Sequence, residues 1–574
     1  MKRVLIILVL MIPGLLLFGQ EISSFRNLGT CGVLDDDADL AFDPIELNYL
    51  EGTNIFTNLS NFSRYDRIYA NEGANRLTIG LSTDKCLVEN LKRALLFSYY
   101  DVKTPNDINF YTDPNSENAQ TAFGEIEHTW EEFYDTNGNM LYDMHHSYFQ
   151  HYQNVDHEKG WNIFLNHAYE ISPQLRAGAK LGYMSWNSGH NRSSSNLLDF
   201  SHGDYSTHIL ETQASLPDSD PGVDSLLIME EITGDFGMGF KENTFQAELA
   251  VASQMEKGEI SASLLFEIFN SEMETDDAAE YWFTSLDEDE FELESQNDVR
   301  SQNGWYAGLG LGYRKILVEA EERKNEGYLS VDGRIGYIGM AAENSEVTTA
   351  SYDYDGLETG IWEQGLEEKG DQGGFDLGAL IRLNYPLNQR TFFGTGLNYH
   401  FQSQSMDGEF IYFAEAEESE YLEEGEWLST VASTWEISGD TRHEVTASQV
   451  VVPAGLEYWF ANNMKWALRF GSVFTQTSST GNRTFEPTNS EPQTTTYTSA
   501  ANPDPVIEYS ENTYEMESEH TTTRESETSF CYGLGYKPSE NLQIDLMGMF
   551  DVESVQIWNT QFFRSLRISF SLRL

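Results

Sequence analysis

Alternation of apolar and polar residues constrains this chain more than any other feature. In the last segment, Leu566, Ile568, Phe570 and Leu572 stand at even positions, with Arg567, Ser569 and Ser571 between them. Successive side chains of a β-strand point to opposite faces, so a period of two predicts a strand with one apolar and one polar face. The same pattern recurs at 76–82, 177–183, 307–313 and 376–385. The sequence therefore predicts an all-β fold.

Short turn sequences join several alternating segments in pairs. They are Glu256–Gly258, Pro386–Gln389, Ala461–Asn463 and Pro538–Asn541, whereas long polar stretches separate other segments. Tight turns at one end of a sheet and long excursions at the other are typical of outer-membrane barrels. We predict a transmembrane antiparallel β-barrel of about 14 strands, with a range of roughly 12 to 18.

A secreted β-sandwich or propeller is the alternative, because its strands also alternate. Two features favour the barrel. The segments have about 9–11 residues, the length of a tilted membrane strand. Aromatic residues at segment ends match an interfacial girdle; they are Tyr183, Trp186, Trp305, Tyr399, Tyr458 and Trp459.

The net charge of −59, from 93 acidic and only 34 basic residues, excludes a nucleic-acid partner, which requires clustered Lys and Arg. The acidic residues are concentrated between the alternating segments, at about 271–300, 404–440 and 475–528. We predict that these three stretches are long acidic extracellular loops.

The first 20 residues have the pattern of a secretory signal peptide. Lys2 and Arg3 precede an apolar run from Val4 to Phe18. With a barrel, this predicts the outer membrane of a Gram-negative-type bacterium, with outer-membrane lipid as a partner. Cys31, Cys86 and Cys531 are too few for a disulfide scaffold, although Cys31 and Cys86 could pair after export.

Residues 21–53 neither alternate nor have low complexity. Here the sequence resembles the FadL-type family of outer-membrane transporters for hydrophobic compounds, including its PorV-like relatives. The resemblance rests on a small-residue stretch, an acidic run and a Pro-x-x-Leu element, at Gly32, Asp36, Asp37, Ala38, Asp39, Phe42, Pro44 and Leu47. Asp43 stands where the family has Asn, and Ile45 where it has Ala.

The resemblance implies that residues 21–53 form a hatch inside a barrel built by residues 54–574. The hatch candidates are Gly32, Asp36, Asp37, Asp39, Asp43, Pro44 and Leu47. A periplasmic cap or a plain N-terminal arm is the alternative. A lumen of about 14 strands is too wide for side chains alone to fill, which favours a hatch.

No catalytic residue, metal site or cofactor is predicted. Asp135–Asn139 is similar to the start of a calcium loop, but Met140 and His146 replace the required glycine and glutamate. The chain also lacks a Gly-x-Ser-x-Gly elbow. We expect a non-enzymatic transporter of small hydrophobic compounds such as long-chain fatty acids. The alternatives are a docking or assembly component for secreted or surface proteins, and a general cation-preferring porin. The sequence predicts no particular ligand-binding residues.

Overall fold

The structure is a computed structural model. It describes residues 25–60, 73–86, 88, 90–105, 107–111, 119–134, 144–194, 207–212, 227–284, 289–320, 322–354, 357–422, 427–460, 464–510, 518–551 and 567–574. The predicted signal peptide (1–20) and the calcium-loop-like stretch (135–139) lie outside these residues.

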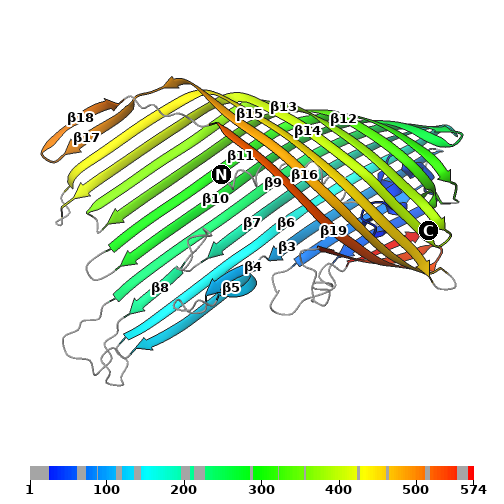
Figure 1. The fold of residues 1–574 in the computed structure, drawn as a ribbon, viewed down its shortest axis with the longest axis horizontal. Coiled ribbons are helices and arrows are strands. Elements are labelled where there is room, and N and C mark those ends of the chain that lie inside the picture. The colour runs from blue at the N-terminus through cyan, green and yellow to red at the C-terminus, as the bar shows by residue number, and fades with distance from the viewer. Residues whose placement is uncertain are drawn as a thin grey trace.

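Within the described residues, sixteen strands form an antiparallel ring that is closed because β1 pairs with both β2 and β21 (Figure 1). In ring order they are β1 (Thr53–Ser60), β2 (Gly73–Thr83), β3 (Leu91–Pro105), β6 (Met144–Ser172), β7 (Leu175–Ser194), β9 (Leu227–Met255), β10 (Gly258–Thr284), β11 (Asp289–Val318), β12 (Gly327–Tyr354), β13 (Glu358–Asn388), β14 (Thr391–Tyr421), β15 (Trp427–Phe460), β16 (Trp466–Ser490), β19 (Glu519–Ser539), β20 (Leu542–Asp551) and β21 (Arg567–Arg573). The ring has two strands more than the 14 we predicted, within the predicted range.

Five further strands extend the sheet without entering the ring. They are β4 (Asp107–Tyr111), β5 (Ala119–Tyr134), β8 (Thr207–Thr212), β17 (Gln493–Ser499) and β18 (Asn502–Ser510). β17 and β18 form a hairpin beside β15, at the end of the strands far from the short turns (Figure 1).

The outer face of the ring carries a continuous apolar band. Leu249, Leu264, Leu309, Ile335 and Leu377 are direct register neighbours on five successive strands, and each is between 43% and 62% exposed. Outer-membrane barrels carry an exposed band of this kind, and lipid covers its apolar side chains. None of the helices in the described residues has the length and apolar composition that a membrane-spanning helix needs.

Two of the six predicted girdle residues face the interior instead. Trp186 packs on Phe240 with ring centroids 5.1 Å apart, and Trp459 donates a hydrogen bond from Nε1 to Glu457 at 2.9 Å. Adjacent residues of a strand point to opposite faces, so Trp459 points inward because Tyr458 points outward.

The three stretches predicted as acidic loops are mostly strands, which corrects that prediction. Residues 271–284 of β10 pair with 289–302 of β11, and the acidic parts of β14 and β15 also pair with each other. β10–β15 have 27 to 34 residues each, whereas about 9–11 cross a membrane. Beyond the apolar band both faces of the sheet meet water, so the ladder continues without the alternation that identifies a strand in a sequence.

The N-terminal segment lies inside the ring, at the end with the short turns. It contains α2 (Phe25–Leu28), α3 (Asp37–Phe42) and η1 (Glu46–Tyr49), and we call residues 25–50 the plug. Its apolar side chains pack on opposite parts of the wall: Leu40 and Leu47 near Ala94 and Ala168 of β3 and β6, and Val33 near Phe392 of β14. The plug therefore crosses the lumen.

Candidate functional site

Local capping gives the first half of the plug its shape. Cys31 and Gly32 have φ of 52° and 85°, so a left-handed turn follows α2. Asp36 caps α3, because its Oδ1 accepts a hydrogen bond from the N–H of Asp37 at 2.9 Å. The N–H of Asp36 donates in turn to Oδ2 of Asp39 at 2.6 Å, which completes a capping box.

A second turn begins at Asp43. Its Oδ1 accepts hydrogen bonds from the N–H groups of Ile45 and Glu46 at 2.7 and 2.8 Å. Asp43 is exposed to the lower cavity, but the surrounding protein reduces its hydration, and together with the nearby charge of Glu46 this raises its pKa to about 7. Pro44 follows and lies against the wall, where a Cβ at Gly178 would overlap the Pro44 carbonyl.

Leu47, the last hatch candidate, is 1% exposed and belongs to an apolar cluster between plug and wall. All seven hatch candidates thus lie in the plug. Their role as a movable hatch stays a prediction.

Three glycines of the wall form a floor for residues 30–33 of the plug. Gly394, Gly455 and Gly471 are register neighbours on β14, β15 and β16. A Cβ at any of them would lie within 2.8 Å of a plug atom. The close approach therefore requires glycine at these positions.

A disulfide joins the plug to the wall beside this floor. Cys31 is bonded to Cys531 of β19, with Cα atoms 6.0 Å apart, and Cys86 is free. The pairing of Cys31 with Cys86 that the sequence left open is therefore wrong. Since the two bonded residues are 500 positions apart, no local pattern could indicate the bond.

A buried ionic chain extends from the plug into the wall. Arg26 Nε donates to Glu457 at 3.0 Å, Arg469 Nε donates to the same carboxylate at 2.8 Å, and Arg469 also reaches Asp545 at 2.6 Å. All four side chains are at most 4% exposed. Removing one member of such a chain leaves a buried charge without compensation, which is strongly destabilising.

The acidic run of the plug, at Asp36 and Asp37, contacts a lysine and a glutamine from outside the plug. Lys324 Nζ, in the short helix η3 (Arg323–Asn325), lies 3.3 Å from Asp36 and 2.8 Å from Asp37. Gln543 donates to Asp36 at 3.0 Å. Burial alone would raise the pKa of Asp36, but the charges of Lys324 and Arg26 outweigh it and hold the pKa at about 2.

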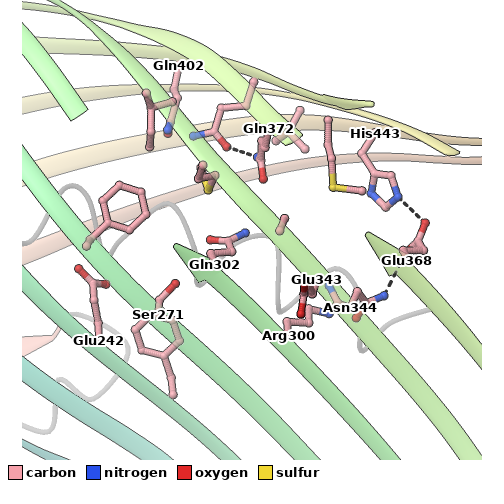
Figure 2. Close-up of a pocket in the computed structure, with 18 of the residues that line it drawn as sticks. Glu242, Ser271, Arg300, Gln302, Glu343, Asn344, Glu368, Gln372, Gln402 and His443 are labelled. Atoms are coloured by element: carbon pink, nitrogen blue, oxygen red, sulfur yellow. Dashed lines mark hydrogen bonds and ion pairs between the residues drawn. The ribbon is translucent and has the colours of Figure 1, made fainter. Parts of the chain in front are cut away.

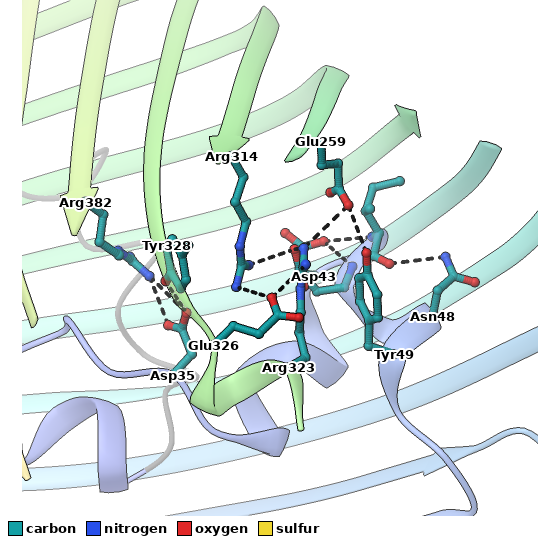
Figure 3. A network of polar contacts seen from close by, with 12 residues as sticks. Asp35, Asp43, Asn48, Tyr49, Glu259, Arg314, Arg323, Glu326, Tyr328 and Arg382 are labelled. Carbon is teal, nitrogen blue, oxygen red and sulfur yellow. Dashed lines mark hydrogen bonds and ion pairs between the residues drawn. The ribbon is translucent and has the colours of Figure 1, made fainter. Parts of the chain in front are cut away.

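A second charged cluster holds the end of the plug, as Figure 3 shows. Arg323 donates to both oxygens of Glu46 at 2.9 Å, and Arg314 lies 3.3 Å from Glu46. Burial opposes ionisation of Glu46, but Arg323 and Arg314 lower its pKa to about 2. On the other side of Figure 3, Arg382 donates to Asp35 at 2.9 Å.

Two cavities follow one another above the plug. The lower cavity, of about 710 Å³, is lined on one side by the plug, including Asp43 and Glu46, and elsewhere by residues of the wall. The upper cavity, of about 170 Å³, lies farther from the plug. Both are lined by Glu267, Ile338 and Gln402, so they are adjacent parts of one lumen.

Both apolar and polar side chains line the upper cavity, and Figure 2 shows Glu242 and Ser271 at one end of it and His443 and Glu368 at the other. Its apolar residues are Phe240, Phe269, Ile338, Met340, Ala342, Met406, Val445 and Ala447. Among the polar residues, Glu368 accepts hydrogen bonds from His443 at 2.7 Å and Thr441 at 2.8 Å and pairs with Arg483. This arrangement can hold an amphipathic molecule.

These lumen residues are absent from the sites predicted from the sequence, although the sequence contains a signal for them. Glu267 stands between Phe266 and Ile268, two exposed apolar residues of the outer band. A charged residue on the other face of such a strand must point into the lumen. Within the described part of the chain, no group of His, Cys, Asp or Glu side chains could hold a metal ion.

No family model and no curated protein matches this chain. Its fold resembles, distantly, a mutant of the ferric enterobactin receptor PfeA from Pseudomonas aeruginosa (8% identity, 91% of this chain and 80% of that chain, TM-score 0.28). It also resembles the siderophore receptor PirA from Acinetobacter baumannii (9%, 92% and 81%, TM-score 0.24) and the outer membrane transporter YddB from Escherichia coli (8%, 97% and 88%, TM-score 0.24). These scores assign no family, and the FadL-type resemblance stays a prediction.

Proposed function

We propose that this protein is an outer-membrane channel that its own N-terminal plug closes, and that it admits small amphipathic compounds from the outside. The observation that carries the proposal is the docking of residues 25–50 across the lumen, directly below two connected cavities, the upper of which is partly lined by apolar side chains. A pore that stays open would need no such closure, so the plug disfavours a general porin.

The polar groups of the upper cavity argue against long-chain fatty acids as its occupants. Among the described residues that line this cavity, Arg300 supplies the single guanidinium. It already donates to both oxygens of Asp298, at 3.2 and 3.0 Å. A fatty-acid carboxylate bound in the upper cavity would therefore have to displace an existing ion pair.

Solute flux into proteoliposomes tests the proposal. We expect slow flux of small neutral sugars through the intact protein and fast flux through a variant that lacks residues 25–50 and carries Cys531→Ser. Circular dichroism and heat-modifiable gel mobility would verify that both barrels are folded. Slow flux through a folded plug-deleted barrel would refute the channel, and equally fast flux through both proteins would refute closure by the plug.

The acidic sheet above the apolar band favours docking of secreted or surface proteins as a second function. β15 has 34 residues, roughly 20 more than the membrane requires, and it pairs with the acidic end of β14. Affinity capture of the intact protein from membranes should then recover a stoichiometric partner. Recovery of the protein alone would count against this role.

A further inference from the structure

We infer that the lumen contains a binding site for a small organic cation with an apolar ring, in which Glu267 receives the charged group and Phe269 with its apolar neighbours receives the ring. This inference rests on the proposed function, because it names the class of compound that the channel admits.

Glu267 is a buried carboxylate that no described residue satisfies. It is 8% exposed, it lines both cavities, and its side chain makes neither a hydrogen bond nor an ion pair within the described residues. The charges of two cations act on Glu267 without bonding to it: Arg334 is already bonded to Asp376 at 2.9 Å, and Lys180 Nζ lies 4.8 Å from the ring centroid of Phe164. Burying a carboxylate without a partner is costly, so an incoming cation would gain a strong interaction here.

The apolar half of the site lies beside this carboxylate. Phe269 is two residues farther along β10, on the same face and about 7 Å away along the strand. It packs against a cluster that contains Ile338 and Met340, which also line the upper cavity. A cavity of about 170 Å³ is similar in size to the engineered cavity of about 150 Å³ that binds benzene. The spacing therefore suits an aromatic ring joined to an ammonium group by a short chain.

The charges around the cavity select a cation over an anion. Its lining has four carboxylates, at Glu242, Glu267, Glu343 and Glu368, and one guanidinium, at Arg300. Arg300 is bound to Asp298, and Glu368 is paired with Arg483 and His443. An anion in the upper cavity would thus meet no cation without a partner among the described residues that line it.

A second carboxylate stands on the approach to Glu267. Glu242 of β9 also lines the upper cavity, and one of its oxygens accepts a hydrogen bond from Thr244 at 2.9 Å. Its register partner on β10 is Ser271, four residues beyond Glu267 toward the extracellular end. A cation that enters through the acidic sheet would therefore reach Glu242 first and then the buried Glu267.

Isothermal titration of the full-length protein in detergent with three matched probes tests the site. The probes are 2-phenylethylamine, 2-phenylethanol and 3-phenylpropanoate, which share a ring and differ in charge. We expect the amine to bind at least tenfold more tightly than the alcohol, and the carboxylate not to bind. Ethylamine, which has no ring, should bind at least tenfold more weakly than 2-phenylethylamine.

Two glutamine variants on β10 localise the site. Glu267→Gln should weaken binding of the amine at least tenfold and leave binding of the alcohol within twofold. Glu272→Gln is the matched control, because Glu272 is exposed on the opposite face of the same strand, and it should bind as the wild type does. Heat-modifiable gel mobility would verify that each variant is folded. Glu242→Gln is a second variant, and it should weaken binding of the amine less than Glu267→Gln does.

Equal affinity for amine and alcohol, or an unchanged affinity in folded Glu267→Gln, would overturn the inference. Equal affinity for ethylamine and 2-phenylethylamine would overturn its apolar half. The outcome is distinguishable from failure of the proposed function, which the sugar-flux experiment measures separately. Sugar flux without a preference for the amine would refute only this inference, and amine binding without flux would refute only the channel.

Discussion

Replacing Glu46 with glutamine should loosen the plug while leaving the barrel folded. Glu46 is bound by Arg323 and Arg314, which hold its pKa at about 2 instead of the ordinary 4.5. One pKa unit corresponds to about 1.4 kcal/mol, so this interaction contributes roughly 3 kcal/mol to docking at neutral pH. Its loss should lower the docking constant by about 100-fold. Arg323 keeps Glu326 as a partner at 3.1 Å, so the wall should stay intact.

Hydrogen–deuterium exchange of the protein in nanodiscs measures this effect directly. The N–H groups of Leu47, Asn48 and Leu50 donate hydrogen bonds within the plug, at 3.1 to 3.2 Å. They should exchange about 100-fold faster in Glu46→Gln, whereas strand amides should not change. Glu256→Gln, in an exposed turn, is the matched control. Exchange within twofold of the wild type would show that these charges do not hold the plug.

Three further changes test other contacts of the plug. Gly455→Leu should push residues 30–33 off the glycine floor and destabilise docking of the plug by about 1–3 kcal/mol. The amides of residues 30–33 should then exchange hydrogen faster, while the gel mobility of the barrel stays unchanged. Unchanged hydrogen exchange would contradict the close approach. Cys31→Ser should slow the denatured, non-reduced protein on a gel relative to the wild type, and Cys86→Ser should not, because Cys31 is bonded to Cys531. Between about pH 4 and pH 7 docked Asp43 holds a proton that the released side chain loses, so docking should weaken as the pH rises through this window. Asp43→Asn should abolish this part of the pH dependence of hydrogen exchange at the plug amides. A pH profile identical to that of the wild type would refute the role of Asp43.

Several structural features could be predicted from neighbouring residues alone. The period of two at 307–313 and 376–385 identified strands, because side-chain direction along a strand depends only on residues two apart. The same rule does not identify the acidic ends of β10 and β14 as strands, because a strand with water on both faces has no such period.

Local patterns were enough to predict alternating strands with an apolar face and to separate residues 21–53 from them. The number of strands, the Cys31–Cys531 bond, the ion pairs of the plug and the burial of Glu267 became visible only in the folded ring. These features join residues that lie far apart along the chain. Arg26 and Glu457 are 431 residues apart and meet because the ring closes around the plug, and no local pattern encodes that closure.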